Sequence, residues 1–126
     1  LLMDLKNFTT GQTAFLVGDG TYGSTRTQRQ SVTVLSVGRK WVKVKIGARE
    51  LQFYSSDPKG EYLCEKVPFG WPRYLFPTEQ LASDWMEKKN LADWLKWAAE
   101  NPPKGGYTLN QLRAIRKILE GKDYEN

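Results

Sequence analysis

The sequence predicts an α+β protein: a small antiparallel SH3-like β-barrel followed by a C-terminal αα-hairpin. Two observations predict it. The first half has short β-branched segments separated by turn residues at close spacing, which is typical of a small closed meander. The second half carries apolar residues at three- and four-residue spacing behind helix-capping residues. We expect a basic barrel over residues 1–67, an aromatic and proline-rich strap over 68–77, and a helical hairpin packed on the barrel over 78–126.

The strands are predicted from β-branched and aromatic residues bounded by turns. They are Thr13–Val17, Ser31–Val37, Lys40–Ile46, Glu50–Tyr54 and Glu61–Val67. Gly38-Arg39 is predicted to form a two-residue type II′ turn, which pairs Val37 with Lys40 and Leu35 with Val42. Because side chains alternate along a strand, Leu35, Val37, Val42, Val44 and Ile46 then line one face. Trp41, Lys43 and Lys45 share the other face with Val32 and Val34.

The strap, residues 68–77, contains three prolines, and we expect it to be neither helical nor part of a central strand. Thr78 is a suitable N-cap for a helix that ends before Asn101-Pro102-Pro103, with a possible break at Asn90. Thr108 and Gln111 form a capping box for a second helix. That helix is too short to be stable alone, so Leu112, Ile115 and Leu119 are expected to be buried against the first helix.

Positive charge is concentrated in the first half of the chain. The net charge is +5, and residues 1–60 hold 9 Lys+Arg against 4 Asp+Glu, whereas residues 61–126 hold 10 of each. Between Tyr22 and Arg49 there are seven basic residues and no acidic one. A field of one sign attracts anionic partners. A few surplus lysines that merely keep the protein in solution explain the same total equally well.

Catalysis has little support in the sequence. The chain contains no His, which excludes Ser–His and Cys–His chemistry and a His-rich metal site. Cys64 has no neighbouring base and is interpreted as a small half-buried residue. The glycine-rich segment 18–23 lacks the Gly-Lys-Ser/Thr ending of a phosphate-binding loop. We therefore expect no enzyme activity, no metal and no cofactor.

The lone cysteine fits a reducing, cytoplasmic environment. No charged segment followed by a long apolar run opens the sequence, and no run approaches the ~20 residues that span a bilayer. We expect neither secretion nor a membrane partner.

The leading hypothesis is binding of DNA, RNA or a nucleoprotein through the hairpin. An exposed indole stacks on a base while neighbouring cations meet phosphates. The candidate residues are Arg26, Arg29, Arg39, Lys40, Trp41, Lys43, Lys45 and Arg49. The opposite interpretation fits the sequence equally well: a helix covers this face, Trp41 is buried, and the aliphatic parts of the lysine side chains extend to place their ammonium groups in water. The sequence leaves both open.

A second hypothesis uses the aromatic residues of the second half. Trp71, Trp94 and Trp97 are candidates for a surface that binds a host bacterial protein. The alternative role for Trp94 or Trp97 is to pack the helices onto the barrel.

Three segments carry a resemblance to a known group of proteins: Gly11–Val17, Ser31–Val44 with its Val37-Gly38-Arg39-Lys40-Trp41 stretch, and Leu75-Phe76-Pro77-Thr78. With these segments the sequence resembles small β-barrel proteins encoded by phages and prophages. The resemblance implies an accessory protein of a phage or mobile element in a bacterial cytoplasm. Such proteins include inhibitors of host defence nucleases, among them anti-CRISPR proteins. Many of those mimic DNA with acidic surfaces, so an inhibitor with a charge of +5 is expected to act without DNA mimicry.

Overall fold

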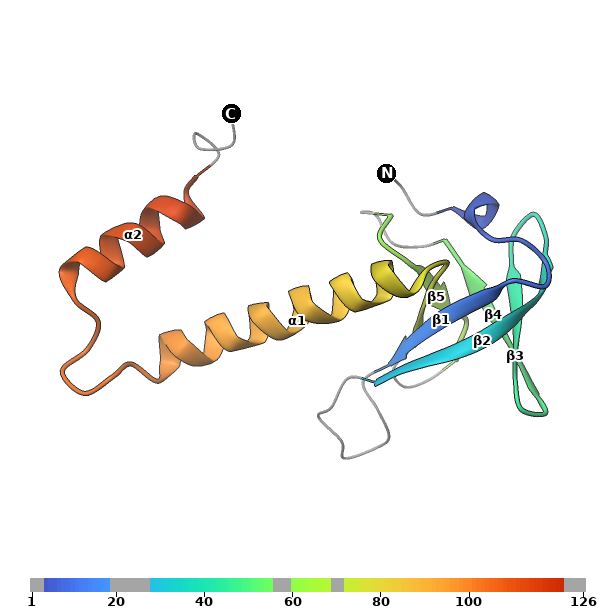
Figure 1. Ribbon diagram of the computed structural model, residues 1–126, viewed down its shortest axis with the longest axis horizontal. Helices are drawn as coiled ribbons and strands as arrows, with labels where there is room; N and C mark the ends of the chain where they lie inside the picture. Colours follow the sequence, from blue (N-terminus) through green and yellow to red (C-terminus); the bar gives the residue numbers. More distant parts are fainter. Residues whose placement is uncertain (1–3, 19–27, 56–59, 69–71, 122–126) are drawn as a thin grey trace. The chain divides into compact units, whose positions relative to one another are not determined.

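The computed structural model describes residues 4–18, 28–55, 60–68 and 72–121. Within them, antiparallel strands form a closed barrel in chain order, with the last strand pairing back onto the first (Figure 1). A 3-10 helix precedes the barrel and two α-helices follow it, which confirms the predicted fold class. The elements are η1 (Leu5–Asn7), β1 (Thr13–Gly18), β2 (Gln28–Val37), β3 (Val42–Ile46), β4 (Arg49–Tyr54), β5 (Leu63–Glu65), β6 (Tyr74–Phe76), α1 (Glu79–Glu100) and α2 (Leu109–Leu119).

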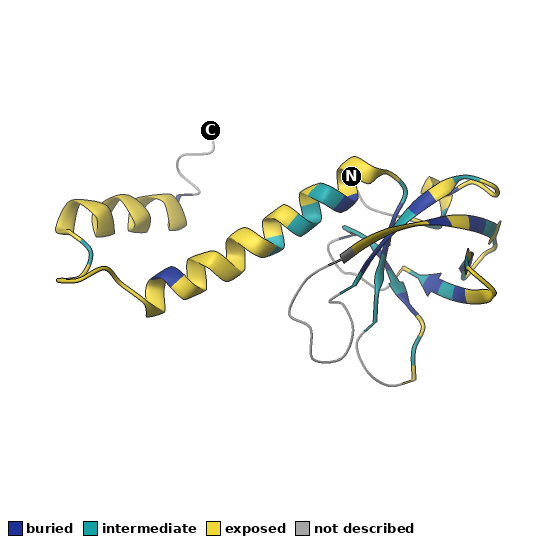
Figure 2. Ribbon diagram, turned by 60° about the horizontal axis from the view of Figure 1, so that its bottom comes forward, coloured by how far each residue is buried: buried dark blue, intermediate teal, exposed yellow. Residues whose placement is uncertain are grey.

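Side chains that alternate along the strands fill the barrel interior. Figure 2 colours the buried residues of the strands dark blue. Phe53 is the largest fully buried side chain of the barrel interior. The other buried members of this core are Phe8, Ala14, Leu16, Val32, Val34, Val42, Val44, Leu51, Leu63 and Leu75. The β-branched residues that predicted the strands are therefore also the residues that pack the core.

The predicted register of the β2–β3 hairpin is wrong. Val37 pairs with Val42 and Val34 pairs with Val44, so the connection is a four-residue loop in which the Gly38 amide donates to the Trp41 carbonyl over 2.8 Å. Between Val34 and Ser36 the register shifts by one residue. This bulge reverses the alternation, so that Val34 and Val37 both face the core.

The turn that needs a left-handed glycine lies at the next hairpin. Ile46 pairs with Arg49, which leaves Gly47-Ala48 as a two-residue turn, and Gly47 has φ +59°. A positive φ at the first central residue is the requirement of a type II′ turn. Gly38 does not have a positive φ, so the type II′ turn predicted at Gly38-Arg39 is wrong.

The expectation that proline keeps the strap out of a central strand is wrong for Tyr74–Phe76. These residues form β6, which pairs with β1 on one side and β5 on the other and so closes the barrel. Pro72 and Pro77 lie just outside the strand. Because no proline is inside it, all three backbone N–H groups remain available to the sheet.

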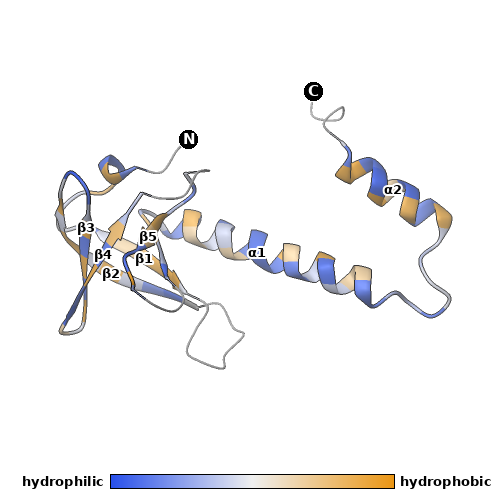
Figure 3. Cartoon of the chain, turned by 180° about the vertical axis from the view of Figure 1, so that it is seen from behind, coloured by the Kyte–Doolittle hydropathy of each residue, from blue (hydrophilic) through white to orange (hydrophobic). Residues whose placement is uncertain are grey.

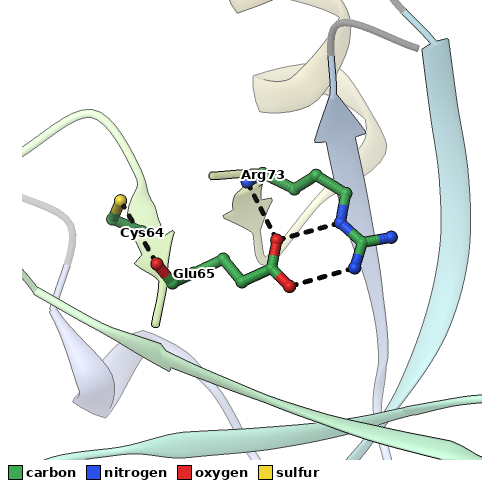
Figure 4. A network of polar contacts seen from close by, with 3 residues as sticks. All are labelled: Cys64, Glu65 and Arg73. Atoms are coloured by element: carbon green, nitrogen blue, oxygen red, sulfur yellow. Dashed lines mark hydrogen bonds and ion pairs between the residues drawn. The ribbon is translucent and has the colours of Figure 1, made fainter. Parts of the chain in front are cut away.

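An ion pair joins β5 to the segment before β6 (Figure 4). The Glu65 carboxylate accepts hydrogen bonds from Arg73 Nε at 2.9 Å, from Nη2 at 3.0 Å and from the Arg73 backbone N–H at 3.0 Å. Glu65 is only 6% exposed. The side-chain hydrogen bond to Glu65 raises the pKa of Arg73, partial burial opposes that rise, and the charge of Glu65 adds to it. These charge-assisted hydrogen bonds hold this corner of the barrel together.

The chain divides into two compact units, Leu1–Lys89 and Asn90–Asn126, so α1 begins in the first and ends in the second. Thr78 caps α1 as predicted, since its Oγ1 accepts from the Leu81 N–H over 3.2 Å. Within the first unit, α1 packs against the ends of β1 and β6 and the segment before β5. This small core comprises Val17, Phe76 and Ala82, with Phe15, Tyr62, Tyr74, Trp85 and Met86 packed around it.

In the second unit, α1 continues without a break to Glu100, and Thr108 and Gln111 form the predicted capping box of α2. The Tyr107 hydroxyl donates to the Ala98 carbonyl over 2.6 Å. The apolar residues of α2 are not buried as expected, and Figure 3 shows them as orange segments on the helix. They are Leu109, Leu112, Ile115, Ile118 and Leu119, all exposed. Packing of the helical hairpin on the barrel stays a prediction.

Among the described residues, none of the helices combines the length and the apolar character needed to cross a membrane.

Candidate nucleic-acid interface

The outer surface of β3 and β4 carries the lysines that the sequence singled out. Because Val42 and Val44 point into the core, Lys43 and Lys45 point outward. Lys43 lies opposite Ser36 on β2 and Gln52 on β4. We call this surface the Trp41 face; its members are Trp41, Lys43, Lys45, Gln52, Tyr54 and Lys66.

Trp41 lies at the end of this surface, in the loop before β3, and is half-buried. The Tyr54 ring meets it in an edge-to-face arrangement, with centroids 5.6 Å apart and planes at 80°. The Lys66 Nζ lies 4.6 Å from the centroid of the indole. The tryptophan is thus neither buried in the core nor free: a tyrosine fixes its orientation and an ammonium covers it.

The backbone fixes the position of Lys66. Its N–H donates to the Gln52 carbonyl over 2.8 Å, which continues the pairing of β4 with β5. Lys43, Gln52 and Lys66 therefore form a row across adjacent strands. At 4.7–4.9 Å per strand step, the two lysine Cα atoms are about 10 Å apart.

The charge on this surface is mostly unneutralised. Within the described part of the chain, Lys43, Lys45 and Lys66 form no ion pair. Glu50 lies directly opposite Lys45 on β4 and weakens the positive field at that end. A polar hollow of about 180 Å³ adjoins Lys45 and is lined by Thr13, Gln30, Ser31, Val32, Thr33, Ile46 and Gly47 as well. Cations, hydroxyl groups and the aromatic side chains of Trp41 and Tyr54 thus occupy neighbouring positions on the barrel surface.

The other predicted cations are distributed differently. Arg39 and Lys40 are exposed in the loop beside Trp41. Arg49 is exposed at the opposite end of β3, next to the Gly47 turn. It is in phase with Leu51 and Phe53, the core-facing residues of β4, and so does not share the outer surface with Lys43 and Lys45. The structure therefore brings Arg39 and Lys40, but not Arg49, to the aromatic end of the Trp41 face.

Arg29 has a structural partner. Its guanidinium pairs with Glu79 at 3.0 Å and donates to the Ser83 hydroxyl, which ties β2 to the first turns of α1. A cation held in this way is less available to a phosphate than Lys43 or Lys45. Arg26, the remaining predicted cation, lies outside the described residues.

The part of α1 in the first unit leaves the Trp41 face uncovered. Ala82, Trp85 and Met86 pack on the opposite part of the barrel, around Val17 and Phe76. Residues 79–89 therefore do not form the helical cover that the sequence left open.

The sequence did not predict three members of the Trp41 face: Gln52, Tyr54 and Lys66. Tyr54 carried a usable signal, since it alternates with the buried Phe53 in a predicted strand and so faces outward. Lys66 carried none, because its place beside Trp41 depends on the pairing of β4 with β5.

The residues of the protein-binding hypothesis lie in two places. Trp94 and Trp97 are on α1 in the second unit, each 58% exposed. Trp71 lies outside the described residues.

The carboxylates and the cysteine of the described residues were candidates for a metal site. The described residues contain no group of three or more His, Cys, Asp or Glu side chains placed to hold a metal ion. Cys64 is half-buried, and its thiol donates to the Glu65 carbonyl over 3.7 Å.

A family model described as the Phage ProQ C-terminal-like domain matches residues 3–123. The chain belongs to this family. Membership of the Phage ProQ C-terminal-like domain family, together with the closed barrel, confirms the resemblance to small phage-encoded barrel proteins. Comparisons of this family member with curated proteins and with solved structures gave no match.

Proposed function

We propose that this phage protein is a non-enzymatic nucleic-acid-binding module whose contact surface is the Trp41 face. The observation that carries the proposal is the placement of Trp41, Lys43 and Lys66 together on the outside of the barrel, with no ion pair among the described residues neutralising the lysines. ProQ-like domains are associated with RNA binding, which favours RNA as the nucleic acid.

The chemistry of the face suits a nucleic-acid backbone. Lysine ammonium groups meet phosphates and release counterions, which makes such binding sensitive to salt. The aromatic ring adds a contact to a base that depends little on salt. The hydroxyl groups around the hollow near Lys45 are suitable donors and acceptors for sugar and phosphate oxygens.

The test is binding of a 20-nucleotide single-stranded RNA, measured by fluorescence anisotropy from 50 to 200 mM salt. We expect Lys43→Glu with Lys45→Glu to weaken binding by about tenfold or more and to reduce the salt slope by about 1.4 for the two lost phosphate contacts. The matched control is Lys96→Glu with Lys104→Glu, two exposed lysines of the second unit. Equal effects of the two double variants, or none from either, would reject the proposal.

A second candidate function is an inhibitor of a host defence nuclease that acts without DNA mimicry. The exposure of Trp94 and Trp97 favours it, because large exposed aromatics anchor protein interfaces. This function requires a complex with a host protein that tolerates 0.5 M salt and is lost in Trp97→Ala. Capture of RNA alone from the host cell would favour the first function.

A further inference from the structure

We propose that the Trp41 face selects unpaired nucleotides, and that a base takes the place on the indole now held by the Lys66 ammonium. This inference rests on the proposed nucleic-acid function. The ammonium lies 4.6 Å from the ring centroid, which is where a stacking partner would sit. On binding, the base covers the ring and the ammonium moves to a neighbouring phosphate.

The geometry favours this exchange because the Lys66 side chain can move, whereas the Trp41 ring is held in place. The Trp41 ring is held by the edge of Tyr54 and by its half-buried position. The Lys66 backbone is fixed by the hydrogen bond to Gln52, whereas its exposed side chain forms no ion pair among the described residues. The platform is thus preorganised, and its cover is a flexible side chain.

Stacking is the stronger of the two contacts. An exposed cation–π contact contributes a few-fold to an equilibrium constant, whereas a base stacked on an aromatic ring contributes roughly 5- to 150-fold. A base therefore displaces the ammonium with a net gain. The displaced Lys66 ammonium still contributes to binding, because it interacts more strongly with a phosphate than with the indole ring.

The preference for unpaired nucleotides follows from the shape of the site. In a duplex, both faces of each base are already stacked and only the edges are accessible. An indole lying on a sheet surface cannot reach between stacked pairs, so a duplex contacts the lysines alone. Lys43 and Lys66, about 10 Å apart across Gln52, then meet phosphates of the strand that passes over Trp41.

The experiment compares a 20-nucleotide single strand with a duplex of the same length, using anisotropy over a salt series. We expect Trp41→Ala to weaken single-strand binding about tenfold or more with an unchanged salt slope, and to leave duplex binding unchanged. Lys66→Gln should lower the single-strand slope by about 0.7. Trp41→Phe, which keeps a smaller ring, should fall between wild type and Trp41→Ala, and Trp94→Ala is the control for a distant indole.

The outcomes separate this inference from the proposed function. If Lys43→Glu with Lys45→Glu abolishes binding but Trp41→Ala affects single strand and duplex equally, the face binds nucleic acid without stacking and the inference is wrong. An unchanged slope in Lys66→Gln also rejects it, since the ammonium then never reaches a phosphate. If no charge variant alters binding, the proposed function itself fails.

Discussion

Replacing Arg73 with methionine should destabilise the barrel by about 3 kcal/mol. The substitution removes two of the three hydrogen bonds to Glu65, those from Nε and Nη2, and leaves only the backbone N–H of residue 73. Glu65 is 6% exposed, so its carboxylate stays desolvated without a counter-ion. Removing one partner of a buried pair costs about 3–5 kcal/mol. We take the lower end because the Arg73 side chain is 31% exposed and water can reach the gap.

The assay is urea unfolding followed by circular dichroism. Lys88→Met is the matched control, because Lys88 pairs with Glu61 at 2.7 Å in the same unit but is 64% exposed. A surface pair of this kind contributes at most about 1 kcal/mol. The double variant Glu65→Met with Arg73→Met should recover part of the loss, since no buried charge remains. An Arg73→Met variant within about 1 kcal/mol of wild type would refute the reasoning.

Three further predictions concern stability. Gly47→Ala should lower the free energy of unfolding by about 1–2 kcal/mol. The loss comes from backbone strain alone, because φ is +59° and an added Cβ meets no atom within 4 Å. An unchanged urea midpoint would contradict the turn geometry. Phe53→Ala should cost about 3–5 kcal/mol in the same assay, since the ring is fully buried, and a loss near zero would mean that the core is packed differently. Thr108→Ala removes the N-cap of α2 and should cost about 1 kcal/mol of local stability. Amide hydrogen exchange should show faster exchange in residues 109–119 and none of this effect in the barrel.

The features that the sequence predicted correctly are those that depend on local patterns. Alternation of β-branched residues located most of the strands, and the caps at Thr78 and Thr108 located the starts of both helices. Alternation along β3 alone also placed Trp41, Lys43 and Lys45 on the outer surface, whatever register the hairpin adopts. These properties need no information about distant residues.

The errors arose where pairing between strands decides the result. The bulge after Val34 has no local signal, yet it sends Val34 into the core rather than to the Trp41 face. Tyr74–Phe76 is too short for a recognisable strand pattern, and its role depends on lying between β1 and β5. The contact of Lys66 with Trp41 likewise depends on strand pairing and could not be predicted from the sequence.

The candidate site was therefore only partly predictable. Of the predicted cations, Lys43 and Lys45 lie on the Trp41 face because of their strand alternation. Arg29 is a candidate on its charge alone, and no local pattern indicates that Glu79 on α1 pairs with it. Charge in a sequence identifies candidates, whereas their availability depends on which acidic residues the fold brings near them.

The most direct test of the central claim is an NMR titration of the isotope-labelled protein with a single-stranded RNA. The account requires the largest shifts at the Trp41 indole N–H and at the backbone amides of Lys43, Gln52 and Lys66, with small changes in α2. Shifts confined to the second unit, around Trp94 and Trp97, or no shifts at saturating RNA, would contradict it.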